Sequence, residues 1–335
     1  MREPFRAPRP REPSWDLAAS TQLARSAVAG EVLAEMADDD DRIVVLTADL
    51  MYSNRTVDFE RRHPQRFLNM GIAEQNMVSV AAGLATFGFI PYAASFASFV
   101  GLLAAEQLRT DVAYPGLPVR LLAHHAGVSL GFYGTSHHAT EDLAFLRAVA
   151  DMTVICPCDA ASTAWALRAT VDLDGPVYFR LGRGREPDVY DQATADLQLG
   201  RLASLRDGDD LTIVANGVTV APALGAADRL AAEHGFEATV VDAHTVRPFD
   251  NEGLCDVATR TGRVLVAEEH NVVGGVASAC ADALVDAGLA DVSLKRLGLP
   301  PDEYALIGPP SALYKHYGLD VEGINTAAVA LMEER

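Results

Sequence analysis

The sequence lacks the glycine-rich motifs that hold phosphate groups. Its 335 residues contain no Gly-x-Gly-x-x-Gly after the first strand-like run and no Gly-x-x-x-x-Gly-Lys-Ser/Thr loop. In those motifs, backbone N–H groups at a helix start bind the phosphates of a nucleotide. A phosphorylated cofactor must therefore be held partly by something other than this chain.

Positive charge and long apolar runs are also scarce. Acidic residues outnumber basic ones by 46 to 27, for a net charge of -19, which argues against a nucleic-acid or anionic-membrane partner. The run 90–105 is interrupted by Pro91 and Gly101 and predicts a buried strand and helix, not a membrane span. Residues 1–15, rich in Arg and Pro without an apolar core, predict a disordered arm of a cytoplasmic protein.

Cysteine is rare, with four in the chain. Cys156 and Cys158 form a Cys-Pro-Cys pair, but no second pair or histidine cluster follows it. The pattern favours reduced, buried or half-buried thiols over a metal site, and Cys255 and Cys280 are interpreted in the same way.

Strand-like and helix-like runs alternate along the chain, which predicts an α/β protein with βαβ units on mostly parallel sheets. The strands are almost continuously apolar, as in sheets covered on both faces. In the first half the predicted strands are 43–46, 90–95, 119–124, 153–155 and 177–181, and the helices are 75–87, 102–112, 142–149 and 160–171. In the second half the strands are 211–215, 238–241 and 264–267, and the helices are 221–233, 251–261 and 276–287.

The alternation breaks between Gly182 and Gly208, where Gly, Arg, Pro and Asp dominate. We therefore expect two doubly wound domains, residues 16–185 and 209–335, joined by a linker at 186–208. Ligands of open α/β sheets bind at the carboxyl ends of strands. The polar residues found there are Asp49, Ser95, His124, His125, Arg183, Asn216, Glu268, Glu269 and His270.

Several short motifs recur in a characteristic order. They are GIAEQNM (71–77), SFASF (95–99), the double histidine 124–125, GTSHHATED (134–142), GPVYFRLGR (175–183), HTVRPFD (244–250) and VAEEHNVVGG (266–275). From about Asp16 onward the chain resembles the C-terminal section of transketolase, a pyrimidine-binding domain followed by the transketolase C-terminal domain. The same pair is found in 1-deoxyxylulose-5-phosphate synthase and in β subunits of the pyruvate dehydrogenase family. The resemblance implies the same two-domain fold as the residue pattern.

Full-length transketolases also carry an N-terminal domain, whose Gly-Asp-Gly to Asn motif binds Mg²⁺ and the diphosphate of thiamine diphosphate. No such motif occurs here. The resemblance therefore implies one half of a split enzyme that uses thiamine diphosphate and Mg²⁺, with the metal held mainly by an N-terminal partner subunit. Because the cofactor would span two chains, we expect a heterotetramer with two copies of each subunit.

Glu74 follows an extended apolar segment, residues 67–70, and begins a long, nearly uncharged stretch. By resemblance it is the glutamate that activates the cofactor through a hydrogen bond to N1′ of the aminopyrimidine ring. A carboxylic acid beside an apolar wall can keep its proton, because burial disfavours the anion. The alternative is a glutamate placed at a helix N-terminus by the helix dipole; the surrounding motifs favour the catalytic role.

Phe96 and Phe99 match the aromatic pair that packs against the aminopyrimidine ring. Leu102 stands where transketolases often have Tyr, so one wall of the pocket would be aliphatic. Asp49 matches an aspartate that borders the cofactor. Plain core packing at the i, i+3, i+6 spacing is the alternative for the two phenylalanines.

His125 and His137 match the histidines that contact the substrate. Imidazole suits this contact because its pKa lies near neutrality. His124 and His138 are their neighbours, and His138 stands where many transketolases have Gln. Structural roles at a strand end or in a loop are the alternative for all four.

Arg183 matches the arginine that grips the sugar phosphate, since a guanidinium can bind phosphate oxygens bidentately. Arg185 could substitute for it, and the position of a second phosphate-binding arginine, near Arg25, is ambiguous. Phe132 and Tyr133 replace an acidic residue and the Asp that recognises a sugar hydroxyl. The phenol can still form a hydrogen bond, but the usual acceptor stereoselectivity is in question.

The resemblance implies a transferase that moves a two-carbon glycolaldehyde unit from a ketose, with or without a phosphate, to an aldehyde acceptor in carbohydrate metabolism. One alternative is a β subunit that passes an acyl or glycolyl unit to a lipoyl or carrier-protein arm. Another is a non-catalytic protein of the same fold. His270, Arg247, Pro248 and Asp250 are expected to be structural, in a second domain that contributes mainly to subunit assembly.

Overall fold

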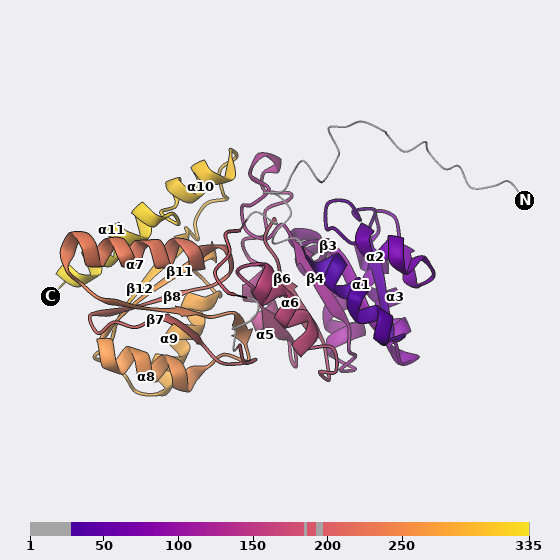
Figure 1. Cartoon of the computed structure of the whole chain (residues 1–335), viewed down its shortest axis with the longest axis horizontal. Coiled ribbons are helices and arrows are strands. Elements are labelled where there is room, and N and C mark those ends of the chain that lie inside the picture. Colours follow the sequence, from indigo (N-terminus) through magenta and orange to yellow (C-terminus); the bar gives the residue numbers. More distant parts are fainter. Residues whose placement is uncertain (1–27, 184–185, 192–196, 335) are drawn as a thin grey trace, which may run out of the picture.

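The computed structural model describes residues 28–183, 186–191 and 197–334. The predicted arm at 1–15, Arg25 and Arg185 lie outside these ranges. Two α/β halves lie side by side, with the N-terminal half at one end and the C-terminal half at the other (Figure 1). No helix in the described ranges is both long and apolar enough to span a membrane.

The sheet of the first half has seven strands in the order β10-β5-β6-β4-β3-β1-β2. All pairs among β1 to β6 are parallel. The five predicted strands of this half are present, and the extended segment before Glu74 forms β2. The bounds are β1 (Ile43–Thr47), β2 (Phe67–Asn69), β3 (Ile90–Phe96), β4 (Arg120–His124), β5 (Thr153–Ile155), β6 (Val177–Arg180) and β10 (Thr245–Arg247).

Three of the four helices predicted for the first half are present as α3, α5 and α6, the fourth differs between residues 98 and 113, and α1 and α2 were not among the predicted ranges. The regular helices are α1 (Ala29–Asp39), α2 (Val57–Arg62), α3 (Glu74–Thr86), α5 (Asp142–Ala148) and α6 (Ala160–Ala169). In place of one α-helix at 102–112, the chain forms a π-helix η4 (Ser98–Leu103), a short α4 (Ala105–Gln107) and a second π-helix η5 (Leu108–Ala113). A Cβ at Gly101 would lie 2.8 Å from the Tyr178 hydroxyl, so glycine allows η4 to pack directly on β6.

The second half has a five-stranded sheet in the order β12-β11-β8-β9-β7, which is parallel except for β7. Helices α7 and α11 cover one face and α8 and α9 the other (Figure 1). Strand β7 falls inside the segment 186–208 predicted as a linker. The bounds are β7 (Ala203–Arg206), β8 (Leu211–Ala215), α7 (Val220–His234), β9 (Ala238–Asp242), α8 (Asn251–Thr261), β11 (Arg263–Asn271), α9 (Val276–Asp286), β12 (Ser293–Leu299), α10 (Pro310–His316) and α11 (Val321–Glu333).

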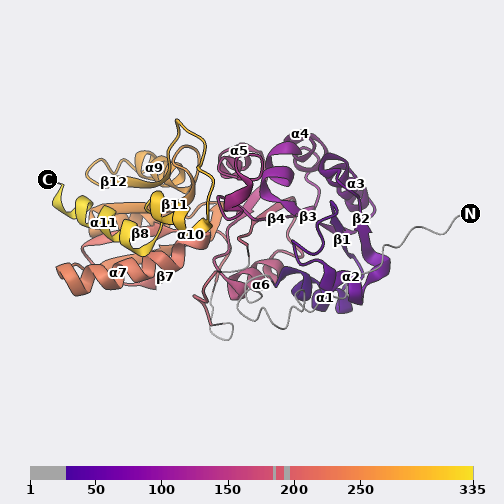
Figure 2. The same cartoon turned by 90° about the horizontal axis from the view of Figure 1, so that it is seen from above.

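The two halves share structure across their boundary. Strand β10 belongs to the second half in sequence but pairs antiparallel with β5 of the first. One apolar cluster contains buried side chains of both halves, among them Val154, Val246 and Val264. Helix α5 lies at this boundary in both views (Figure 2).

The four cysteines are free thiols, as expected. Cys156, Cys158 and Cys280 are buried and Cys255 is half-buried. Burial raises the pKa of Cys156 to about 12, so this thiol stays protonated and acts as a small apolar side chain.

Arg180, at the end of β6, forms a buried ion pair with Asp142 of α5, with Nε 2.9 Å from Oδ2. We predict that Arg180→Met lowers the free energy of unfolding by about 3–5 kcal/mol, because it leaves a buried carboxylate without its countercharge. The loss is measured by urea denaturation of the full chain.

The matched control is Arg168→Met. Arg168 forms a 2.6 Å pair with Glu35, but both side chains are half exposed, so the loss should stay below about 1 kcal/mol. Equal losses for the two variants would contradict the interpretation of the Arg180 pair.

Candidate functional site

Glu74 is the first residue of α3, yet its side chain does not cap the helix. The N-cap residue, Ala73, provides no side-chain cap, and Glu74 is only 4% exposed. Its Oε1 accepts a 2.9 Å hydrogen bond from the Ser95 hydroxyl, near the end of β3. The carboxyl group is therefore held toward the edge of the sheet by a partner that sequence reasoning did not assign to it.

An aromatic wall stands next to this pair. Phe96 ends β3 and Phe99 lies on η4, with their ring centroids 5.8 Å apart. The His125 ring is 4.7 Å from Phe96, and the His137 ring is 5.1 Å from Phe99. Tyr133 completes the group, 4.9 Å from His137. The structure thus brings together five of the side chains predicted for the site, from two separate segments.

The three of these residues that follow β4 belong to one loop, residues 125–138, here called the histidine loop. It begins at His125, whose φ of +60° turns the chain out of the strand. Gly127 and Ala139 lie opposite each other at the two ends of the loop, here called its neck, and are joined by two 3.0 Å backbone hydrogen bonds. Near its end, Ser136 Oγ lies 2.9 Å from His137 Nδ1 and so orients that ring.

The other two predicted histidines are both buried, but in different surroundings. His124 ends β4, where burial, with a smaller contribution from His125, lowers its pKa to about 3. A neutral, buried ring of this kind fits the structural alternative. Burial also lowers the pKa of His138, and neither ring nitrogen has a hydrogen-bond partner in the described parts of the chain.

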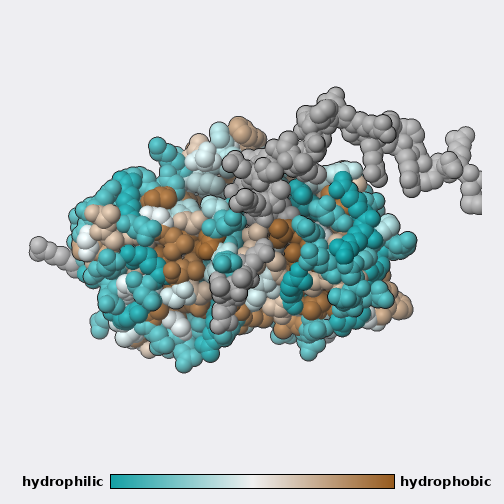
Figure 3. Space-filling view, in the orientation of Figure 1, coloured by the Kyte–Doolittle hydropathy of each residue, from teal (hydrophilic) through white to brown (hydrophobic). Residues whose placement is uncertain are grey.

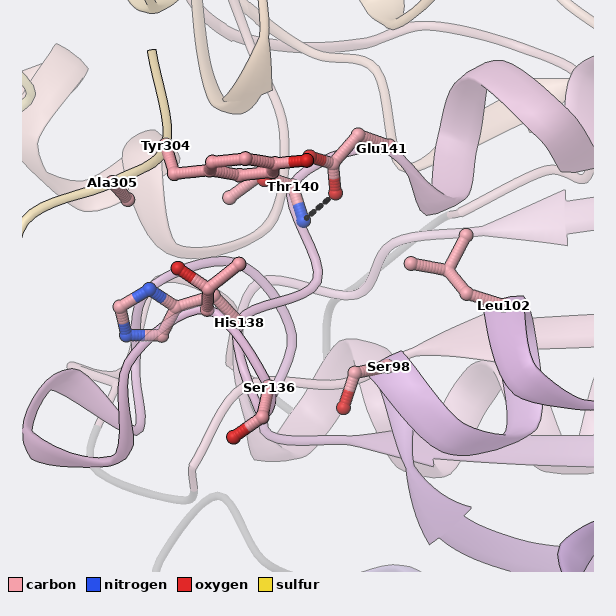
Figure 4. Close-up of a pocket in the computed structure, with 9 residues that line it drawn as sticks. Ser98, Leu102, Ser136, His138, Thr140, Glu141, Tyr304 and Ala305 are labelled. Atoms are coloured by element: carbon pink, nitrogen blue, oxygen red, sulfur yellow. Dashed lines mark hydrogen bonds between the residues drawn. The ribbon is translucent and has the colours of Figure 1, made fainter.

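His138 faces a pocket of about 420 Å³ between the two halves. Leu102 and Ser98 of η4 form one side, His138 and Ser136 another, and Tyr304 of the second half lies across the top (Figure 4). Ser98 Oγ is buried and lacks a hydrogen-bond partner within the described ranges. The lining is Ser98, Leu102, Thr135, Ser136, His138, Thr140, Glu141, Tyr304 and Ala305.

Glu74, Phe96 and Phe99 do not line this pocket. The pocket adjoins the aromatic wall through η4, which carries both Phe99 and Leu102. Tyr304 could not have been identified from the sequence, because it lies in an irregular segment between β12 and α10, outside every motif, and reaches the pocket only through the contact between the halves.

Asp49 and Arg183 lie at the same sheet edge, since β1, β3, β4 and β6 are consecutive parallel neighbours. Asp49 is exposed, has a φ of +62° and exchanges two 3.0 Å hydrogen bonds with Asn69. Arg183 is half-buried and is fixed by a 2.8 Å bond from its backbone N–H to Glu186. The preceding residue, Gly182, accepts the His125 N–H, so Arg183 lies next to the base of the histidine loop.

Comparisons with known proteins identify the family and agree with the fold. Residues 21–187 match the model of the transketolase pyrimidine-binding domain, and residues 200–324 match that of the transketolase C-terminal domain. The 6-deoxy-6-sulfo-D-fructose transketolase subunit SqwH of Clostridium sp. (strain MSTE9) is 38% identical over 91% of this chain and 93% of its own length.

A second relative, an apulose-4-phosphate transketolase subunit of Phocaeicola vulgatus, is 36% identical over 91% of this chain and 96% of its own length. Among solved structures, one described as "Split gene transketolase, inactive beta4 tetramer" is 40% identical, with a TM-score of 0.83. The match covers 91% of this chain and 97% of that one.

The buried His124 predicts a specific pH dependence of stability. Its pKa in the folded chain is about 3, below the ordinary value of about 6.5. As the pH falls, the His124 ring is therefore protonated in the unfolded chain before it is protonated in the folded one. Its contribution to the free energy of unfolding is present above pH 6.5 and is lost as the pH falls toward 3. Relative to His124→Gln, the unaltered chain should lose about 2 kcal/mol between pH 6.5 and 5.

Urea denaturation of both proteins at several pH values measures this difference. Between pH 7 and 8 the ring is neutral in both states, so the two unfolding free energies should differ by a constant. Parallel curves through pH 5 would show that His124 is protonated as easily in the folded chain as in the unfolded one.

Proposed function

Since this chain belongs to the transketolase family, we propose that it is the C-terminal subunit of a split, thiamine diphosphate-dependent transketolase. It transfers a two-carbon glycolaldehyde unit from a ketose donor to an aldehyde acceptor, and is active only with its partner subunit, in the cytoplasm. The observation that carries this proposal is the buried Glu74–Ser95 pair beside Phe96 and Phe99.

The residues present fit the aminopyrimidine part of thiamine diphosphate. Phe96 and Phe99 offer aromatic surface for a flat ring, Leu102 offers an aliphatic wall, and Ser98 carries a buried hydroxyl that no described residue satisfies. Glu74, oriented by Ser95, would form the hydrogen bond to the ring nitrogen. When bound, the cofactor supplies a carbanion nucleophile that cleaves the bond next to a ketose carbonyl.

The substrate would lie against the histidine loop. His125 and His137 would bind the donor oxygens and the acceptor carbonyl, with Tyr133 and His138 beside them. Arg183 would hold an anionic end of the sugar. The names of the two relatives support an anionic substrate, since one acts on a sulfonated sugar and the other on a sugar phosphate.

Apolar side chains exposed around the site support the need for a partner. Ile72, two residues before Glu74, is 86% exposed, and Leu103, next to Leu102, is 54% exposed. Elsewhere on the chain, the face shown in Figure 3 has a group of hydrophobic residues over the second half. The relatives are described as subunits, and the β4 tetramer of the split-gene relative is described as inactive. We propose that an N-terminal subunit, which holds Mg²⁺ and the diphosphate, covers this region in an α2β2 heterotetramer.

Reconstitution with such a subunit, thiamine diphosphate and Mg²⁺ tests the proposal against a panel of ketose and ketose phosphate donors. Glu74→Gln should lower kcat at least about 100-fold, because the hydrogen bond to the reacting ring is altered. The control Glu106→Gln, on the exposed side of α4, should stay within about twofold of the unaltered protein.

Two outcomes would overturn this proposal. Activity that depends on a lipoylated or carrier-protein arm, with none toward free sugars, would favour the β subunit alternative. Full activity of Glu74→Gln on any substrate would remove Glu74 from the chemistry.

Tyr133 predicts an altered acceptor preference. It is 60% exposed beside His137 and occupies the position of the family's hydroxyl-recognising Asp. Tyr133→Asp should raise kcat/KM for 2-hydroxyaldehydes relative to unsubstituted aldehydes by about tenfold. Tyr133→Phe, which keeps the ring and removes the hydroxyl, should not. An equal ratio in all three proteins would show that this position does not select the acceptor.

A further inference from the structure

Glu269 is a buried carboxyl group that the proposed chemistry does not use. It lies in β11 of the second half and is only 2% exposed, at the boundary with the first half. Burial raises its pKa to about 7, although the nearby charge of Arg180 opposes the shift. A group that is costly to bury needs specific partners, and the two hydrogen-bond donors to the Glu269 carboxyl group come from different halves of the chain.

The side chain of Glu269 binds the start of the histidine loop. Its Oε1 accepts a 2.9 Å hydrogen bond from the Val128 N–H and another of 2.9 Å from the Tyr314 hydroxyl on α10. The carboxyl group thus connects a backbone amide of the first half to a helix of the second half.

The carboxyl group also packs directly on Gly127. A Cβ at that position would lie 2.1 Å from Glu269 Cδ, and Gly127 has a φ of +59°. Both observations require glycine. Glu269 therefore fixes residues 127 and 128 by contact as well as by hydrogen bonding.

The main chain of Glu269 holds the other side of the loop neck. Arg180 Nη2 donates to the carbonyl oxygens of Ala139 and Glu269, each at 2.9 Å. Ala139 is the backbone partner of Gly127. Both ends of the loop are therefore tied to one residue of β11.

The underside of the loop rests on the second half. Val128 is fully buried in an apolar cluster with Leu299, Leu313, Tyr317 and Leu319. The Gly131 carbonyl accepts a 3.2 Å bond from the Gly308 N–H. His125 and His137 stand on the opposite side, against Phe96 and Phe99.

We propose that Glu269 is a positioning residue. It sets the position of the histidine loop, and through the loop the positions of His125 and His137. Its own domain contributes no described residue to the group of Glu74, Ser95, Phe96 and Phe99. The role in catalysis rests on the proposed function, whereas the fixing of the loop does not. Glu269 does not touch the substrate.

Glu268 provides a matched control. It is adjacent in β11 and fully buried, and burial likewise raises its pKa to about 7. It also accepts two hydrogen bonds, but from the N–H groups of Val276 and Ala277 at the start of α9, within its own half. Its removal destabilises the second half without releasing the histidine loop.

Hydrogen exchange of the full chain, followed by mass spectrometry, tests the positioning role without any activity assay. Glu269→Ala should speed exchange in peptides covering 126–139 roughly tenfold, because the Val128 amide loses its buried acceptor. Peptides from β1 and α3 should keep their rates. Glu268→Ala should speed exchange in α9 and leave the loop unchanged. Unchanged loop exchange in a folded Glu269→Ala protein would overturn the inference.

Steady-state kinetics of the reconstituted enzyme tests the catalytic consequence. Glu269→Ala should raise the KM for the donor about tenfold or more while the affinity for thiamine diphosphate stays within twofold, since Glu74, Phe96 and Phe99 lie on α3, β3 and η4, outside the histidine loop. Glu269→Gln, whose carbonyl oxygen can still accept the Val128 N–H, should restore most of the loss. If Glu269→Ala does not fold, hydrogen exchange and kinetics are measured on Glu269→Gln instead. Exchange should then rise slightly in the peptides of the histidine loop only. An equal rise in all peptides would overturn the inference.

A reconstituted enzyme without transketolase activity would refute the proposed function but leave the exchange result standing. A Glu269→Ala protein whose histidine loop exchanges faster but whose activity and KM are normal would instead show that catalysis does not depend on the position of the loop. The two failures are thus distinguishable.

Discussion

The hydrogen bonds and the ion pair of the buried Arg180 guanidinium hold together the parts of the molecule that form the site. Arg180 ends β6 and bonds at once to Asp142 on α5, to the carbonyl of Ala139 at the loop neck, and to the carbonyl of Glu269 in the second half. Burial is the largest influence and opposes its charge, but the surrounding acidic groups, with Asp142 foremost, together raise the pKa of Arg180. A single cation therefore joins the first sheet, the histidine loop and the second domain, which are far apart in the sequence.

The sequence predicted much of this architecture, because the strands are almost uniformly apolar and the helices have clear ends. Helix α8 starts and ends at the predicted residues, and β5 and β8 match theirs. The pattern did not predict the two π-helices between residues 98 and 113. The close packing of Gly101 on Tyr178 within the first of them is a long-range contact that the local sequence does not reveal. Nor could it place β10 in the first sheet, because pairing between the halves leaves no local signal.

For the site as well, the sequence predicted residues that belong to local motifs but not those that act through long-range contacts. Motifs predicted Glu74, Phe96, Phe99, His125 and His137 as site residues. The structure brings the four rings among them together and bonds Glu74 to Ser95, the residue before Phe96. The resemblance assigned the substrate role to His125 and not to its neighbour His124. In the structure both side chains are buried, and His125, which has a φ of +60°, packs its ring on Phe96. Ser95, Tyr304 and Glu269 act through contacts between segments that lie far apart, so their roles emerged only from the fold.

In the proposed site this chain would supply one wall of the cofactor pocket, and its sequence has no glycine-rich phosphate motif; the proposed activity therefore requires a second subunit. The most direct test is calorimetric titration of thiamine diphosphate and Mg²⁺ into this chain alone, and into its complex with the N-terminal subunit. Binding should be absent or weaker than about millimolar for the chain alone and at least about 100-fold tighter for the complex. Equally tight binding to the isolated chain would contradict a cofactor site divided between two subunits.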